Sequence, residues 1–185
     1  MVSILQNNIN NSSAHRESRE QNAEYILKNF ELFPDFIEMA FNTKDKNNYK
    51  SCWILELVLE QKIALVLPYL DTFCHSLKKY SNPSAIRSIS KICMFLSKYH
   101  IQKQNVNEMI LSEKLMQIII EKCFDWIIDE HEKVASKVYA IRTLFELGKT
   151  QKWIYPELKQ ILTDDYNKHS AAYKAVAREI LKKIK

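Results

Sequence analysis

Basic residues stand near the start of four mostly apolar segments of this 185-residue chain. They are Lys50, Arg87, Lys137 and Lys174, at intervals of 37, 50 and 37 residues. If these segments are stacked helices, the four cations form a basic ladder that could hold an anionic partner by several charges at once. The other interpretation, which we favour, is that each cation pairs with an acidic or carbonyl group of its own or the next repeat.

Three tryptophans are candidate contact residues. Trp53, Trp126 and Trp153 could stack on nucleic-acid bases or anchor a protein partner. Packing between repeats is the explanation we prefer, because large aromatic side chains dominate protein cores. Asp125 precedes Trp126, but neighbours on a helix point about 100° apart, so these two cannot together frame a flipped base.

Carboxylates and histidines offer little for metal or acid–base chemistry. Asp125 and Asp129 are one helical turn apart and His131 follows, a set that could bind a metal. The stretch 129–132 fits a polar turn before a helix better. Four histidines have no partner at ligand or triad spacing, namely His15, His75, His100 and His169. We therefore predict no catalytic residues, no metal and no cofactor; a catalytic site assembled from distant residues has no local sequence motif.

Composition excludes several classes of enzyme. The chain has one glycine, Gly148, so it cannot contain a glycine-rich phosphate loop, a dinucleotide fingerprint or a nucleophile elbow. The net charge is +5, and arginine supplies five of the 27 cationic residues. Because phosphate-binding surfaces usually favour the arginine fork, this balance weakens a nucleic-acid function without excluding it.

The cysteines and the hydropathy pattern indicate a cytoplasmic protein. The four cysteines lie in apolar stretches without a C-x-x-C motif, at Cys52, Cys74, Cys93 and Cys123. We expect buried free thiols, as in a reducing compartment. The longest apolar run, residues 63–70, is too short to span a membrane.

Apolar residues three and four apart predict about nine helices joined by short turns. The clearest stripes are Val66, Leu70, Phe73 and Leu77; Ile86, Ile89, Cys93 and Leu96; Val134, Val138, Ile141 and Phe145; and Ala172, Val176, Ile180 and Ile184. Helix breaks are expected at Pro34, Pro83, Ser112, Gly148 and Ser170, with a longer polar linker near residues 100–111. Residues 1–13 are asparagine-rich and predict a flexible tail, followed by a single domain over 14–185.

A repeat of two helices and two turns accounts for the 37-residue interval. Pro68 and Pro156 stand near the start of the helix that precedes the next basic segment. In this arrangement the chain resembles the HEAT family of helical repeats, and it is similar to small bacterial HEAT-like proteins through residues 31–34, 49–53, 123–126 and 170–174. Some proteins of that kind carry the label adenylosuccinate lyase, which this sequence does not support: of that enzyme's signature loop it offers only Ser81-Asn82-Pro83.

The resemblance implies an all-α, right-handed α-α superhelix whose concave face binds a partner. It implies a non-catalytic scaffold for a protein or peptide. Nucleic-acid binding through the basic ladder is the alternative, and an enzyme of unassigned reaction comes third, because repeat folds serve many functions.

Overall fold

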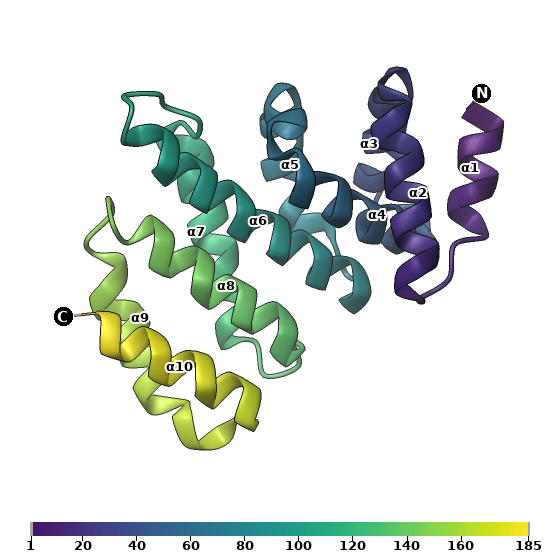
Figure 1. The fold of residues 1–185 in the computed structure, drawn as a ribbon. Helices are drawn as coiled ribbons and strands as arrows, with labels where there is room; N and C mark the ends of the chain where they lie inside the picture. The colour runs from purple at the N-terminus through teal and green to yellow at the C-terminus, as the bar shows by residue number, and fades with distance from the viewer. Residues whose placement is uncertain (1, 185) are drawn as a thin grey trace. The chain divides into compact units, whose positions relative to one another are not determined.

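The computed structural model describes residues 2–184, and these form an all-α protein without strands (Figure 1). The described residues hold ten α-helices and four short 3-10 helices. In chain order they are α1 (Val2–Asn10), α2 (Arg16–Lys28), η1 (Phe30–Leu32), α3 (Phe33–Phe41), α4 (Asn48–Gln61), η2 (Ile63–Tyr69), α5 (Leu70–Ser76), η3 (Leu77–Lys79), α6 (Pro83–Gln104), α7 (Glu113–Ile128), α8 (Val134–Leu147), α9 (Ile154–Asp164), η4 (Tyr166–Lys168) and α10 (Ala171–Lys183). The prediction of an all-α chain is confirmed, with one more helix than expected.

The additional helix is α1, where the sequence predicted a flexible tail over residues 1–13. Leu5 and Ile9 are one helical turn apart on α1, and both are buried. Ser12, just after the helix, is buried as well. The tail prediction rested on average composition, and the average conceals two apolar residues that share one helix face.

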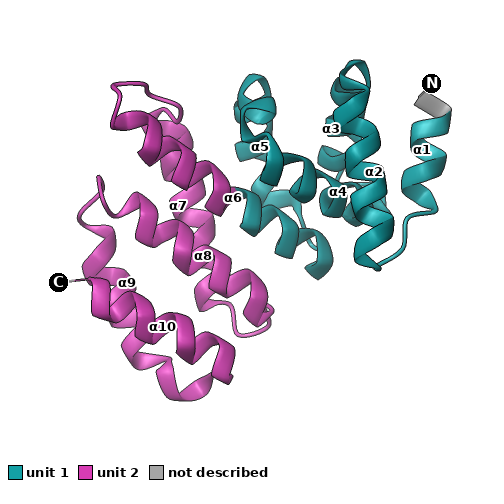
Figure 2. Ribbon diagram, viewed as in Figure 1, with its two compact units in different colours: residues 1–92 teal, residues 93–185 magenta. Residues whose placement is uncertain are grey.

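The chain divides into two compact units, residues 1–92 and residues 93–185 (Figure 2). The division falls inside α6, between Ile92 and Cys93. The single domain expected over residues 14–185 stays a prediction.

The core of the first unit forms around α4, which packs against α2 and α3. Apolar residues of α3 and α4 fill this core, among them Phe36, Ile37, Ala40, Ile54, Leu55 and Val58. The carbonyl oxygen of Ala40 accepts hydrogen bonds from Cys52 Sγ at 3.5 Å and from the Tyr80 hydroxyl at 2.9 Å. The carboxyl-terminal end of α3 is thereby fixed to α4 and to the segment before α6.

In the second unit α7 and α8 pack as neighbours, and α8 also packs against α9 and α10 (Figure 1). The predicted cap of α7 is confirmed, because Ser112 Oγ accepts a 3.3 Å hydrogen bond from the backbone N–H of Leu115. On α8 the predicted stripe is only partly buried: Ile141 is in the core, while Val138 and Phe145 are half-buried.

The loop between α6 and α7 is shorter than predicted, because α6 continues to Gln104. Asn107 has a φ of 61°, a conformation that asparagine tolerates better than most residues. At the end of the loop, the backbone N–H of Leu111 donates to Nδ1 of buried His100 at 3.1 Å. This bond ties the loop to α6.

Gly148 follows α8, as predicted, but its role differs from that of an ordinary helix stop. Its φ is −61°, which any residue adopts. The requirement for glycine comes from packing, since a Cβ at this position would overlap the ring of Tyr155. The Tyr155 hydroxyl donates to the carbonyl of Phe145 at 3.2 Å, and the two rings stack at 5.9 Å between centroids.

Candidate functional site

The four residues of the basic ladder lie within the first five residues of α4, α6, α8 and α10. The sequence interval thus marked the starts of four helices correctly. What each cation contacts differs from helix to helix, so we describe them within their own units.

In the first unit both ladder cations bind acceptors of the protein. Lys50 Nζ donates to the backbone carbonyl of Asn10, just before the chain turns toward α2. Arg87 Nη1 lies 3.4 Å from Oε2 of Glu56, with the arginine side chain 38% exposed. The first cation therefore fastens the end of α1 to α4, and the second forms part of a cluster around Glu56.

Glu56 is a buried carboxylate on α4, with 4% of its side chain exposed. The Ser88 hydroxyl donates to its Oε2 at 2.6 Å, and Lys91 Nζ donates to its Oε1 at 2.9 Å. Lys91 also reaches Glu60 at 3.3 Å. A buried carboxylate is tolerated only when paired and hydrogen-bonded, and here residues of α6 supply both.

In the second unit Lys137 is almost completely buried, with 2% of the residue exposed. Its Nζ donates a 2.8 Å hydrogen bond to the carbonyl of Ile127, in the last turn of α7. Burial lowers the pKa of this lysine. Lys137 lines a cavity of about 310 Å³ together with Asp165 and His169. The pKa of His169 is lowered, first by burial and second by the positive charge of Lys137.

Lys174, the last residue of the ladder, is half-buried on α10. Its Nζ lies 5.8 Å from the centre of the Tyr166 ring, within the range of a cation–π contact.

The tryptophans differ in exposure. Trp126 is buried, with 2% exposed, so it is a packing residue. Trp53 is half-buried and packs edge-on against Tyr49 at 4.9 Å, with the guanidinium of Arg19 5.7 Å from its ring centre. Trp153 is 47% exposed and stacks on Phe124 at 6.2 Å. Of the three, Trp153 presents most surface to solvent.

The suggested carboxylate–histidine set has a local structural role. Asp129 Oδ1 accepts the backbone N–H of His131 at 2.9 Å, which stabilises the turn between α7 and α8. Asp125 lies 3.7 Å from Lys122 Nζ on its own helix. Over residues 2–184, no group of three or more metal-binding side chains comes together.

All four cysteines are buried, as the sequence predicted, and Cys52, Cys74 and Cys123 are free thiols within the described chain. Burial raises the pKa of the Cys52, Cys74 and Cys123 thiols to about 12. These three thiols are therefore protonated near neutral pH and are weak nucleophiles.

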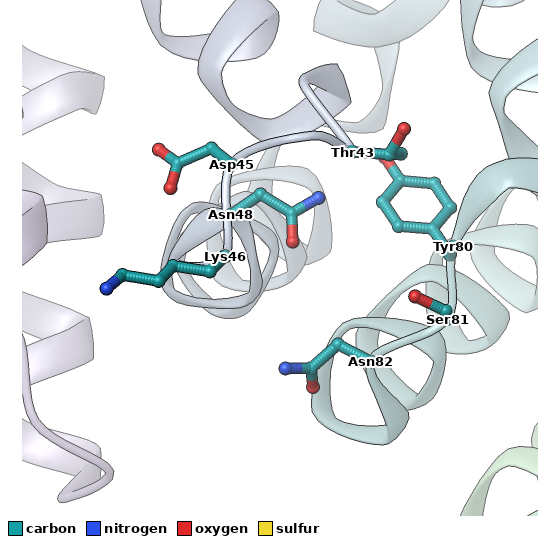
Figure 3. Close-up of a pocket in the computed structure, with 7 residues that line it drawn as sticks. All are labelled: Thr43, Asp45, Lys46, Asn48, Tyr80, Ser81 and Asn82. Carbon is teal, nitrogen blue, oxygen red and sulfur yellow. The ribbon is translucent and has the colours of Figure 1, made fainter.

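A cavity of about 270 Å³ in the first unit was not foreseen from the sequence (Figure 3). It lies at the amino-terminal ends of α4 and α6, and its lining residues are Thr43, Asp45, Lys46, Asn48, Tyr80, Ser81 and Asn82. Asn48 is only 5% exposed, and its Nδ2 is buried without a hydrogen-bond partner among the described residues. The pairs Asn47-Asn48 and Ser81-Asn82, each before or at a helix start, were the available signal.

A family model described as a HEAT repeat domain matches residues 5–184. The chain is a HEAT repeat protein. The match extends over both units and includes residues 5–10 of α1, which lie outside the domain predicted over residues 14–185. No match was found among curated proteins or among solved structures. None of the described helices of this HEAT repeat protein is long and apolar enough to cross a membrane.

Proposed function

We propose that this HEAT repeat protein is a non-catalytic scaffold that binds a protein or peptide partner. The main support for the proposal is that three of the four basic-ladder cations contact acceptor groups of the protein itself. Lys50 and Lys137 donate to backbone carbonyls, and Arg87 faces Glu56. Cations held in this way are poorly placed to contact phosphates, which argues for a partner recognised by other groups.

Other exposed features suit a protein partner. Trp153 is a large aromatic side chain, half exposed and backed by Phe124, and tryptophan is among the commonest anchors of protein interfaces. In the polar cavity of the first unit, Asn48 Nδ2 is a hydrogen-bond donor that has no acceptor among the described residues. Both features can recognise a polypeptide without a strong positive field.

The three high-pKa thiols support the non-catalytic part of the proposal, because cysteine chemistry needs an accessible thiolate. HEAT repeats are in general interaction scaffolds. The cytoplasm remains our proposed location, resting on the expectation of reduced cysteines.

A peptide-display selection against the purified chain tests the proposal. Enriched peptides are resynthesised, and their affinity is measured by calorimetry at low and high salt. We expect saturable binding that largely survives added salt. Failure to enrich any peptide, together with turnover of a small molecule by the pure protein, would overturn the scaffold assignment.

The nucleic-acid alternative is tested in the same buffers with a mixed-sequence DNA duplex. If the basic ladder binds phosphates, the plot of log affinity against log salt is steep, and its slope falls when Arg87 and Lys174 are changed to glutamine. We expect weak binding and no change in slope. A slope that decreases with each substitution would favour nucleic acid over peptide.

A further inference from the structure

The cavity at the starts of α4 and α6 has the features of a binding site for a specific chemical group (Figure 3). All of its lining residues belong to the first unit. The segment before α4 supplies one side of it, and residues 80–82 before α6 supply the other.

Asn48 provides the donor. Its amide group is directed toward the space bordered by Tyr80, Ser81 and Asn82 (Figure 3). The residue is 5% exposed, and Nδ2 has no partner within residues 2–184. A buried N–H group without an acceptor is costly, so an acceptor atom placed in this cavity would be bound favourably.

Two helix ends favour an acceptor that carries negative charge. Helix α4 begins at Asn48 and α6 begins at Pro83, and both helices are long enough to have an appreciable dipole. The amino-terminal end of each carries partial positive charge, although Asn82 Oδ1 already accepts the backbone N–H of Ser84 at the start of α6, at 2.8 Å. The Asn47 side chain makes no capping hydrogen bond at the start of α4.

The charged residues of the lining leave this preference in place. Asp45 Oδ1 already accepts the backbone N–H of Asn47 at 2.8 Å. Asp45 and Lys46 extend away from Tyr80 and Asn82 (Figure 3). Apart from Asp45 and Lys46, the lining side chains carry neutral hydroxyls and amides, a set suited to a singly charged planar group more than to a phosphate dianion.

We infer that this cavity binds a carboxylate, with Asn48 Nδ2 donating to one of its oxygens. The inference rests on the proposed scaffold function and specifies its ligand chemistry: the carboxylate belongs to an acidic side chain or the carboxyl terminus of a bound peptide. A small free carboxylic acid offers the same chemistry, and the experiment separates the two sources.

The test is a nuclear magnetic resonance titration of the full ¹⁵N-labelled chain, which detects the Asn48 side-chain amide directly. The probes are acetate, inorganic phosphate, and acetylated, amidated pentapeptides that differ only in a central glutamate or glutamine. A third peptide carries the glutamine but a free carboxyl terminus. We expect the glutamate peptide or the free-terminus peptide to bind at least about tenfold more tightly than the neutral one, with the Asn48 amide protons moving downfield.

Two variants separate the amide donor from general charge effects. Asn48→Asp removes the donor and places a negative charge at the start of α4. Asn47→Asp makes the same change one residue away, outside the cavity lining. We expect at least about tenfold weaker binding for Asn48→Asp and little change for Asn47→Asp. If Asn48→Asp does not fold, Asn48→Ala takes its place, because alanine also lacks a side-chain donor, and the shift of the wild-type Asn48 amide is a separate test.

Several outcomes would overturn the inference. Equal affinity for the glutamate, free-terminus and neutral peptides would show that the cavity does not recognise a carboxylate. Equal losses of affinity in the two variants would show that Asn48 is not the donor. Tighter binding of phosphate than of any carboxylate removes the proposed ligand class. Saturation by acetate with no gain from any peptide assigns the site to small acids and removes the peptide source. Peptide shifts that spare Asn48 refute the cavity alone, whereas a chain that binds no peptide refutes the scaffold function.

Discussion

The hydroxyl of Ser88 on α6 donates a 2.6 Å hydrogen bond to Oε2 of Glu56 on α4. Lys91 donates to the other oxygen of the same carboxylate. The second unit has a comparable link between α8 and α10, where the guanidinium of Arg142 donates two hydrogen bonds to the carboxylate of Glu179, with N–O distances of 3.3 and 2.7 Å. In both units a carboxylate and a cation join two helices whose basic-ladder residues are 37 positions apart in the sequence.

Removing the buried carboxylate is predicted to destabilise the first unit strongly. Glu56→Ala leaves Lys91 and Ser88 without their main acceptor, so we expect a loss of about 3 kcal/mol in the free energy of unfolding. The control is Glu60→Ala, which removes a 44%-exposed partner of the same lysine and is expected to cost less than about 1 kcal/mol. Urea unfolding followed by circular dichroism measures both, and equal losses would contradict the buried role of Glu56.

Stability is predicted to fall in acid partly through Glu179. Hydrogen bonds from Lys183 and then Arg142 lower the pKa of this carboxyl from its usual 4.5 to about 2. The folded state therefore holds the charged form more strongly, and this contribution is complete above pH 4.5 and is lost as the pH falls toward 2. Glu179→Gln should flatten the decrease in unfolding free energy between about pH 5 and about pH 3.

Because the Glu179 side chain is 36% exposed, solvent and salt screen its interactions. The difference between wild type and Glu179→Gln is therefore expected to shrink at high salt. An acid dependence that is identical in the two proteins would show that Glu179 does not contribute.

A methyl group at Gly148 is predicted to disrupt the contact between α8 and α9. Gly148→Ala would push against the Tyr155 ring, with an expected cost of about 2 kcal/mol. Without that contact, alanine would be neutral or stabilising at this φ. A double-mutant cycle with Tyr155→Leu tests the cause: the cost of alanine should largely disappear once the ring has been replaced, and a cost that persists would point to the backbone instead.

Helix α1 is predicted to contribute to stability as part of the core. Leu5→Ala should cost about 3 kcal/mol, because this side chain is 1% exposed. Ile4→Ala, on the neighbouring residue that is 56% exposed, should change the free energy of unfolding by less than about 0.5 kcal/mol. Chemical unfolding of both variants measures these changes. Negligible effects of both substitutions would favour the flexible tail predicted from the sequence.

Local patterns were enough to predict much of the fold. Ser112 before an acidic, apolar stretch predicted the start of α7, and the basic positions predicted the starts of four helices. The stripe from Val66 to Leu77 is buried as expected, although its backbone alternates between 3-10 and α-helix. These features depend on neighbours within a few turns, which the sequence displays directly.

The site depends on residues that are distant in sequence, and for that reason it was missed. Glu56 stands in an apolar run, and nothing nearby reveals that Ser88 and Lys91 will meet it. Asn48 is one of many asparagines, and its neighbourhood includes residues 80–82, which are distant in the sequence and line the same cavity. The acceptors that the basic ladder contacts likewise depend on tertiary structure, since Lys137 donates to a carbonyl of the preceding helix.

The two acid–base links have opposite polarity. In the first unit the carboxylate is on the earlier helix, at Glu56, whereas in the second the earlier helix carries Arg142 and the later one carries Glu179. Similar hairpins tend to exchange places during folding or between chains. An exchange that set α4 against α10 would bring carboxylate against carboxylate, and one that set α6 against α8 would bring cation against cation. The reversed order of charge in the two units thus penalises an exchange of segments between them.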